Sequence, residues 1–244
     1  ERIASYAKEF GLDELTMPES NKMLDALAKD TEKSSSIGEE SLDSTINYLK
    51  TTKAGKEIVK ELIKAGAYVN ANGGIGDDTI HLGYNTTVEY NQANGGVGND
   101  KIYVKGNYNS VLGEAGDDII TVTGNNNANG GDGRDTFTLI GDNNYVYGEA
   151  GADTVTISSG TGNYVYTGED NDIITITAGE TNKIYGDDGD DTIYVKGGTS
   201  NTAYGGEGND YMEISNGTSN TINGGNGNNQ LYIKGGSKGY AYGG

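Results

Sequence analysis

Short stretches of alternating apolar and polar residues recur from residue 73 to the end of the chain. Each has two apolar residues two places apart, as Ile120 and Val122 are, with more variable positions between them. Successive side chains of a strand point to opposite faces, so each pair predicts a short strand with one buried face. The predicted inward residues are Ile80 and Leu82, Ile102 and Val104, Ile120 and Val122, Phe137 and Leu139, Val155 and Ile157, Ile174 and Ile176, Ile193 and Val195, Met212 and Ile214, and Leu231 and Ile233.

A second short strand in each repeat is predicted to supply one inward aliphatic residue. The resulting core is thin, and burial at roughly 25 cal/mol per Å² is not expected to offset the backbone entropy lost by so many glycines. Another source of stability is therefore expected. The inward residues of these second strands are Ala93, Val111, Ala128, Val146, Val165, Ile184, Ala203, Ile222 and Ala241.

A ten-residue unit, Gly-Gly-x-Gly-x-Asp-x-(apolar)-x-(apolar), precedes and includes the first strand of each repeat. A fixed period of this size indicates stacked coils, and about 18 residues hold two short strands and two tight turns. We therefore predict a mainly β fold, a two-sheet parallel β-roll, in preference to a three-sheet β-helix with longer coils. The nine units begin at residues 73, 95, 113, 130, 148, 167, 186, 205 and 224.

Residues 1–66 have a helical pattern instead. Leu24 and Leu27 recur at helical spacing, and a further apolar stripe over 58–63 ends before a glycine. We predict a small helical capping region over 1–66 and a β-roll over 67–244, with the helices covering the first coil as terminal caps of solenoids do.

The charge is strongly negative and concentrated in the repeats. The whole chain has a net charge of −19, and residues 67–244 hold seven Lys and Arg against 23 Asp and Glu, or −16. This excludes a basic nucleic-acid-binding surface. The absence of Cys excludes disulfides and thiolate metal sites. No apolar run is long enough for a transmembrane segment. The chain stops two residues into a repeat, so we expect it to be part of a longer protein.

The sixth position of the unit carries a carboxylate in eight of nine copies. Stacking would place these groups about 4.8 Å apart, where like charges repel and raise one another's pKa. The column is expected to be stable only with cations between successive coils. Carboxylates and inward carbonyls, with no His or Cys, favour Ca²⁺ over Mg²⁺. This aspartate column is Asp78, Asp100, Asp118, Asp135, Asp153, Asp172, Asp191 and Asp210.

Over residues 67–244 the chain resembles the RTX (repeats-in-toxin) family of hemolysin-type calcium-binding repeats, especially the longer repeats of large toxins and adhesins. The resemblance implies a parallel β-roll that holds several Ca²⁺ ions in one column, and export from Gram-negative bacteria by type I secretion machinery. It also implies that the aspartate column supplies the side-chain ligands. By the same resemblance, turn-glycine carbonyls complete the shells: Gly73, Gly76, Gly95, Gly98, Gly113, Gly116, Gly130, Gly133, Gly148, Gly151, Gly186, Gly189, Gly205 and Gly208.

Some copies depart from the unit. Thr167 and Asp170 replace two turn glycines in the sixth copy, and Asn229 replaces the aspartate of the ninth. We expect weaker sites in 167–172 and 224–229. The second glycine is replaced in three copies, by Glu114, Glu149 and Asp187.

An amide recurs four residues before most units. Its structural interpretation, which we favour, is a buried ladder of amides that bond to one another and to turn carbonyls. Its functional alternative is a second ion site, although carboxylates are missing there. This asparagine column is Asn91, Asn109, Asn126, Asn144, Asn163, Asn182, Asn201 and Asn220.

No catalytic constellation is found. The single histidine, His81, stands at an outward strand position, and neither a zinc-protease motif nor a phosphate-binding loop occurs. We predict a non-catalytic, calcium-binding β-roll of a large secreted toxin, which folds on Ca²⁺ outside the cell. The main alternative is the repeat region of a surface adhesin or S-layer protein, and the expected location is secreted or cell-surface.

Two outward surfaces allow further alternatives. Outward threonines suggest ice binding as a further alternative, although Ile119 and other residues break the array. Among these threonines are Thr136, Thr138, Thr154 and Thr156. Tyrosines on the second strands either stack on host-surface glycans or, as we favour, on one another. They are Tyr145, Tyr147, Tyr164, Tyr166, Tyr185, Tyr204, Tyr240 and Tyr242.

Overall fold

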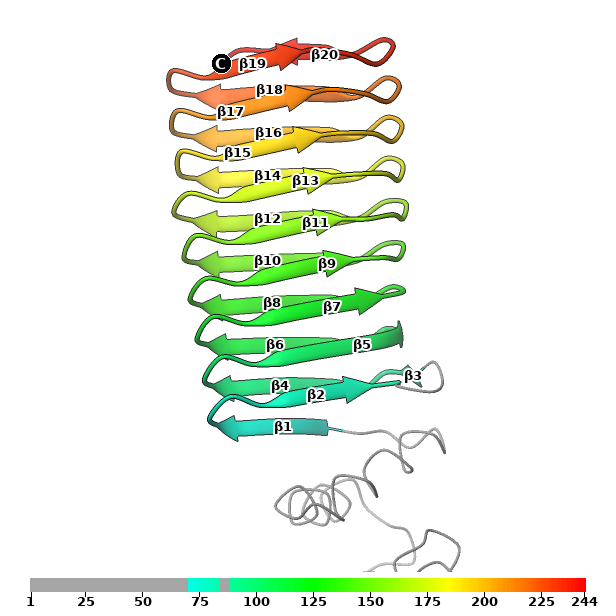
Figure 1. Ribbon diagram of the computed structural model, residues 1–244, viewed down its shortest axis with the longest axis vertical. Coiled ribbons are helices and arrows are strands. Elements are labelled where there is room, and N and C mark those ends of the chain that lie inside the picture. The colour runs from blue at the N-terminus through cyan, green and yellow to red at the C-terminus, as the bar shows by residue number, and fades with distance from the viewer. Residues whose placement is uncertain (1–69, 84–87) are drawn as a thin grey trace, which may run out of the picture. The chain divides into compact units, whose positions relative to one another are not determined.

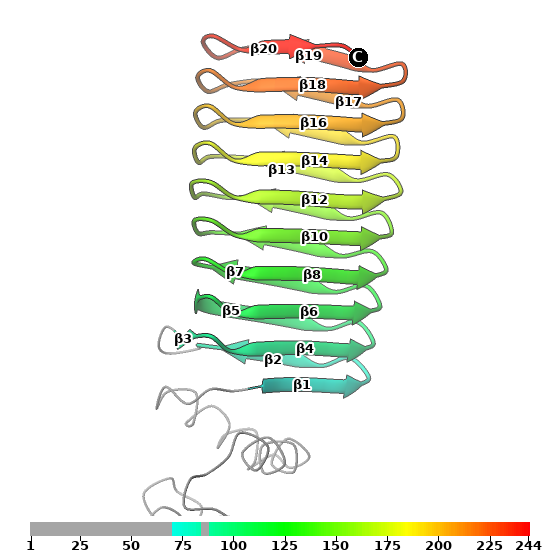
Figure 2. The same ribbon diagram turned by 180° about the vertical axis from the view of Figure 1, so that it is seen from behind.

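The computed structural model describes residues 70–83 and 88–244 as a stack of flattened coils. Each coil contributes one strand to each of two parallel sheets that lie face to face (Figures 1 and 2). The two-sheet parallel β-roll predicted from the sequence is confirmed. The helical region predicted over 1–66 lies outside the described residues.

The first sheet contains the strands that lead into each Gly-rich unit, and its order follows the chain. Its strands are β1 (Asn70–Ile75), β4 (Gln92–Val97), β6 (Ser110–Ala115), β8 (Asn127–Asp132), β10 (Tyr145–Ala150), β12 (Tyr164–Glu169), β14 (Lys183–Asp188), β16 (Thr202–Glu207), β18 (Thr221–Asn226) and β20 (Tyr240–Tyr242).

The second sheet contains the strands that follow each unit's aspartate. Its strands are β2 (Thr79–Leu82), β5 (Lys101–Asn107), β7 (Ile119–Thr123), β9 (Thr136–Leu139), β11 (Thr154–Ile157), β13 (Ile173–Ile176), β15 (Thr192–Val195), β17 (Tyr211–Ile214) and β19 (Gln230–Ile233), and the short β3 (Val88–Glu89) also pairs with β5.

The core lies between the sheets and consists of aliphatic columns. Val146 pairs in register with Val165, and Val155 with Ile174, so that each inward residue rests on its equivalent in the next coil. The predicted inward residues are buried in every coil except the last. There Ile233 is 47% exposed, because the last described coil has a neighbour on one side only.

The outward face of the first sheet carries a stack of tyrosine rings. Tyr147, Tyr166, Tyr185 and Tyr204 lie nearly parallel, with successive ring centroids 5.5, 4.7 and 5.0 Å apart. Each inner ring has both faces covered by its neighbours, as the cross-strand interpretation predicts. Free aromatic faces in this stack therefore exist only at its two ends.

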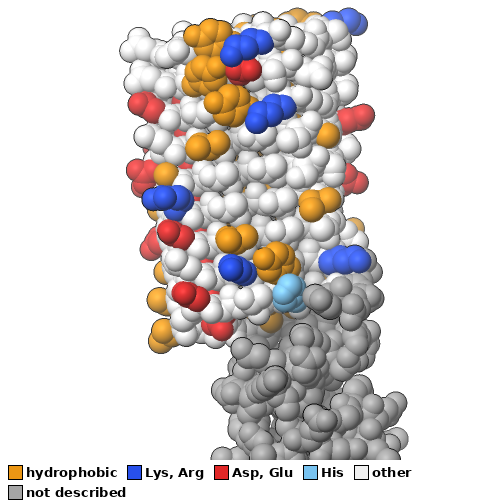
Figure 3. All heavy atoms as spheres, viewed as in Figure 1, with side chains coloured by type: hydrophobic (Ala, Val, Ile, Leu, Met, Phe, Trp, Pro, Cys, Tyr) orange, Lys and Arg blue, Asp and Glu red, His pale blue; other side chains and the backbone are white. Residues whose placement is uncertain are grey.

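The outward face of the second sheet is uncharged over β7, β9, β11 and β13. Thr121, Thr138, Thr156 and Thr175 follow one another in register across these strands. Figure 3 shows this central area between lysine side chains toward both ends of the face.

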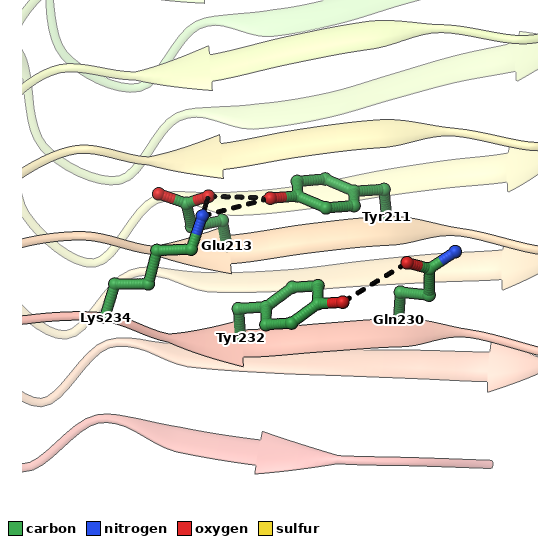
Figure 4. A network of polar contacts seen from close by, with 5 residues as sticks. All are labelled: Tyr211, Glu213, Gln230, Tyr232 and Lys234. Carbon is green, nitrogen blue, oxygen red and sulfur yellow. Dashed lines mark hydrogen bonds and ion pairs between the residues drawn. The ribbon is translucent and has the colours of Figure 1, made fainter.

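Near the C-terminal end of the second sheet, polar side chains link β17 to the residues after β19 (Figure 4). Lys234 Nζ lies 2.6 Å from Glu213 Oε2, which also accepts a hydrogen bond of 2.8 Å from the Tyr211 hydroxyl. Because Lys234 is exposed, such a pair adds little stability. We therefore assign this network no part in holding the coils together.

One edge of the roll is held by the asparagine column. Asn163 Oδ1 accepts hydrogen bonds from both the backbone N–H and the side-chain Nδ2 of Asn144, at 2.8 and 2.9 Å. The same arrangement recurs along the column, as in Asn201 with Asn182. Where both acceptor positions of the amide oxygen are used in this way, no oxygen is left for a cation. This supports the structural interpretation of the amides.

Candidate metal centre

The opposite edge carries the aspartate column, in the turns that join the first sheet to the second. From Asp100 to Asp210 its members are at most 1% exposed, whereas Asp78, in the first described coil, is half-buried. Side chains separated by 17 to 22 residues in sequence therefore form one continuous buried row, as predicted. Such a row of acids requires compensation, because burying unpaired carboxylates is costly.

One oxygen of each carboxylate from Asp100 to Asp210 links neighbouring coils. The backbone N–H of Asp135 donates to Asp153 Oδ1 at 2.7 Å, and that of Asp153 donates to Asp172 Oδ1 at 2.7 Å. Equivalent bonds of 2.6 to 3.0 Å run from Asp78 to the ninth copy. These bonds fix each carboxylate in orientation, so that the second oxygen has a defined position.

That second oxygen is buried and has no hydrogen-bond partner within the described part of the chain. This holds for Oδ2 of Asp100, Asp118, Asp135, Asp153, Asp172, Asp191 and Asp210. A buried acceptor without a donor is destabilising, and its recurrence along the column indicates that the fold provides these atoms for a ligand wherever the turn leaves space for one.

Glycine at the first position of the unit leaves the space beside Oδ2 free of side chains. A Cβ at Gly148 would collide with Asp153 Oδ2 and with the carbonyl oxygen of Thr167 in the next coil. The same two kinds of oxygen surround the equivalent point at Gly113, Gly186 and Gly205. Carboxylate and carbonyl oxygens thus converge with no donor between them, and this arrangement fits a hard cation such as Ca²⁺.

The fourth position supplies the sharp turn. Gly116, Gly133 and Gly151 have φ values of 129°, 133° and 120°, a region that side-chain-bearing residues rarely adopt. In the sixth copy Asp170 has a φ of 75° at this position. Glycine is therefore favoured by backbone geometry at the fourth position, and turn carbonyls are the groups that remain to complete a coordination shell.

Carbonyls are needed because the side chains alone are too few. Within residues 70–83 and 88–244, no three His, Cys, Asp or Glu side chains are grouped closely enough to hold a metal ion by themselves. The carboxylates of the aspartate column are spread along the axis of the roll, one in each coil. A shell of six or more oxygens, as Ca²⁺ prefers, would have to include backbone oxygens of two coils.

The electrostatics of the column favour neutralisation. Burial, reinforced by the neighbouring carboxylates, raises the pKa of Asp153 to about 8 and those of Asp135 and Asp191 to about 7, against the lowering effect of the backbone N–H bonds. Burial likewise raises the pKa of Asp118 and Asp172 to about 6. Without a cation, the column is therefore expected to take up protons near neutral pH.

A second polar row, at the fifth position, was not predicted from the sequence. Asp190 Oδ1 accepts the backbone N–H of Asn209 at 2.6 Å, and Asn171 Oδ1 accepts that of Asp190 at 2.7 Å. These exposed side chains hydrogen-bond to the turn from its outer side, and the row of Asp and Asn is interrupted at Arg134 and Ala152. The signal was available, since the fifth position is Asp or Asn in seven copies: Asp77, Asn99, Asp117, Asn171, Asp190, Asn209 and Asn228.

A profile of the RTX calcium-binding nonapeptide repeat (4 copies) matches residues 94–122, 120–155, 179–200, 197–213 and 214–236. No curated protein matches the chain.

Among solved structures, the chain is similar to the X-ray crystal structure of a hyperactive, Ca²⁺-dependent, beta-helical antifreeze protein from an Antarctic bacterium. The two are 21% identical, the similarity covers 72% of this chain and 77% of that one, and the TM-score is 0.41. Apart from the unit that contains Asp172, the repeat profile matches the turns that carry the buried acids. This chain belongs to the family of RTX calcium-binding nonapeptide repeats.

Proposed function

We propose that the β-roll is a non-catalytic module that folds on binding Ca²⁺ outside the cell and that it forms part of a large secreted bacterial toxin. The observation that carries the calcium dependence is the row of buried Oδ2 atoms without hydrogen-bond donors. The toxin assignment and the type I export route rest on the family resemblance.

The mechanism follows from the residues of the aspartate edge. Bound Ca²⁺ would supply positive charge between successive coils. Asp118, Asp135 and Asp153 would hold it through Oδ2, while their Oδ1 atoms keep the coils in register. The first-position glycines would contribute carbonyl oxygens. Because the unfolded chain cannot assemble this arrangement, binding free energy becomes folding free energy.

The affinity of the module for Ca²⁺ determines whether it folds inside or outside the cell. Extracellular calcium modules bind at about 10⁻⁴ to 10⁻³ M, well above cytosolic free Ca²⁺. The module would therefore stay unfolded inside the cell, pass through a secretion channel as an extended chain, and fold outside. The described residues contain no helix with the length and apolar character needed to cross a bilayer.

A catalytic role is not proposed. His81 stacks on Tyr103, with ring centroids 4.7 Å apart, on an outward strand face. The acids of the aspartate column use Oδ1 to accept the coil-to-coil hydrogen bonds described above. Neither arrangement places an acid and a base around a common substrate position.

Circular dichroism of the full chain in EDTA, in about 1 mM Ca²⁺ and in about 1 mM Mg²⁺ tests the proposal. We expect strong β signal only with Ca²⁺. The variant D118N/D135N/D153N should lose most of this response, whereas D117N/D190N, which alters exposed acids at the fifth position, should keep it. Equal β content in EDTA and Ca²⁺ would refute calcium-dependent folding.

A second candidate function is adsorption to ice, which the threonines of β7, β9, β11 and β13 favour. They form rows about 4.8 Å apart across strands and about 7 Å apart along them, with no charge to desolvate. Tyr103 and Tyr194 bound the long row. Thermal hysteresis that disappears in T138Y/T156Y but persists in Y147T would support it; none in the calcium-loaded wild type would dismiss it.

The adhesin or S-layer alternative has less support from the tyrosines. A sugar stacks on an aromatic face, and the inner faces of the Tyr147 to Tyr204 stack cover one another. A glycan array with the calcium-loaded chain tests it directly. Binding that is lost in Y147A or Y204A, whose rings end the stack, would favour an adhesin.

A further inference from the structure

The sixth coil differs from its neighbours at the first position of the unit. Thr167 lies in the register of Gly148 in the coil before and Gly186 in the coil after. Its side chain is fully buried. It therefore occupies the kind of space that the first glycine leaves free beside Oδ2 in the other coils.

The Thr167 hydroxyl has a defined partner there. Its Oγ1 donates to the carbonyl oxygen of Gly186 at 3.0 Å. In other coils, the carbonyl at this position converges with a carboxylate Oδ2 that has no donor, as at Gly205 beside Asp191. Thr167 thus supplies a hydrogen-bond donor to an oxygen that elsewhere is available to a cation.

In the ninth coil, a side-chain amide supplies the hydrogen-bond donor. The backbone N–H of Asp210 donates to Asn229 Oδ1 at 2.8 Å, the same link that the carboxylates from Asp100 to Asp210 accept. Because that N–H requires an acceptor, the amide nitrogen must take the place of Oδ2. Asn229 Nδ2 donates to the carbonyl oxygens of Gly225 and Asn226 at 3.2 and 3.4 Å.

The two coils therefore share one feature: each places a donor of the protein's own against turn carbonyls, where the remaining coils offer only oxygens. Between residues 94 and 236 the matches to the RTX repeat leave out one stretch, residues 156–178, whereas they include Asn229. This omission covers the unit that contains Thr167 and is independent of the hydrogen bonds.

We infer that the turns containing Thr167 and Asn229 close without a cation. The calcium column is therefore interrupted, with one run of sites over the coils of Asp78 to Asp153 and a second, shorter run at Asp191 and Asp210. This inference rests on the proposed calcium function and specifies which turns carry it out.

The test counts calcium bound to the full chain at saturation, by flow dialysis with radioactive Ca²⁺. Thr167→Gly restores the space beside Asp172, and Asn229→Asp restores the ninth carboxylate. Each should bind about one ion more than the wild type. Thr167→Ser keeps the hydroxyl and should bind as the wild type does. Unchanged counts in both T167G and N229D, with folding verified by circular dichroism, would overturn the inference.

A second pair of variants keeps the test decisive if T167G does not fold. Asp172→Asn removes the carboxylate of the Thr167 turn and should leave the calcium count unchanged, whereas Asp135→Asn, in an unmodified turn, should lower it. A loss in D172N equal to that in D135N would contradict the inference. A wild-type chain that binds no calcium would instead refute the proposed function itself.

Discussion

The backbone N–H of Asp135 donates to Asp153 Oδ1 at 2.7 Å, and the same carboxylate leaves Oδ2 buried with no donor. On the opposite edge, the backbone N–H of Asn144 donates to Asn163 Oδ1 at 2.8 Å, but there the second side-chain atom is a nitrogen. The two edges thus use one ladder geometry. They differ in the second side-chain atom, which donates hydrogen bonds in asparagine (Nδ2) but can only accept them in aspartate (Oδ2). This difference determines which edge requires a cation.

Asp153→Asn should convert one coil of the calcium edge into a coil of the amide type. The amide keeps the Oδ1 link and provides a donor in place of Oδ2, so the calcium-free chain should become more stable by about 1 kcal/mol or more. The number of bound ions should fall. The midpoint of a calcium titration followed by circular dichroism, together with the bound-calcium count, measures both effects.

Asp153→Ala is the matched control, because it removes the charge but also the Oδ1 link. It should lose calcium without gaining calcium-free stability. If D153N and D153A behaved alike in EDTA, the ladder bond between Asp135 and Asp153 would have no energetic role.

Acid should partly replace calcium. The folded-state pKa values of Asp118, Asp135 and Asp153 are raised to about 6, 7 and 8, above the unfolded value near 4. Their protonation therefore stabilises the fold fully below about pH 4, and this contribution is lost as the pH rises through the folded pKa values. In EDTA, the β signal should be greater at about pH 5 than at about pH 8.5.

Saturating Ca²⁺ should remove most of this pH dependence, since the acids then stay ionised and liganded. The measurement is circular dichroism across the pH range with and without EDTA. A β signal in EDTA that rises with pH would show that the sign of the coupling is wrong.

Thr181→Gly should stabilise the asparagine edge. Thr181 has a φ of 52°, a left-handed conformation that is strained for a residue with a Cβ, while Gly162 and Asn143 occupy the equivalent place in the two preceding coils. Relief of this strain is worth about 1 kcal/mol. We expect a higher midpoint of thermal unfolding in saturating Ca²⁺.

Thr181→Ala separates strain from side-chain contacts, since alanine retains the Cβ that causes the strain. It should leave the midpoint close to that of the wild type. A gain in T181A as large as that in T181G would mean that the threonine side chain, and not the backbone, is unfavourable.

The sequence predicted the architecture well because the inward residues, such as Val155 and Ile174, follow a strict alternation that only a pleated strand satisfies. It also predicted that the acids line up. It could not predict that Asp153 Oδ1 binds the preceding coil while Oδ2 remains free, because this depends on contacts between residues in different coils. For the same reason the sequence predicted only a weaker site over residues 167–172, and not that the hydroxyl of Thr167 bonds to Gly186.

The tyrosine stack provides a last prediction. Tyr166 lies between Tyr147 and Tyr185 and loses two ring contacts on truncation, whereas Tyr204 loses only its contact with Tyr185. An aromatic pair is worth about 0.5 to 1.5 kcal/mol, so Tyr166→Ala should destabilise the calcium-loaded roll by roughly 1 kcal/mol more than Tyr204→Ala. Urea unfolding in saturating Ca²⁺ measures the difference. Equal effects of the two variants would show that the rings contribute as separate strand residues and that their stacking adds nothing.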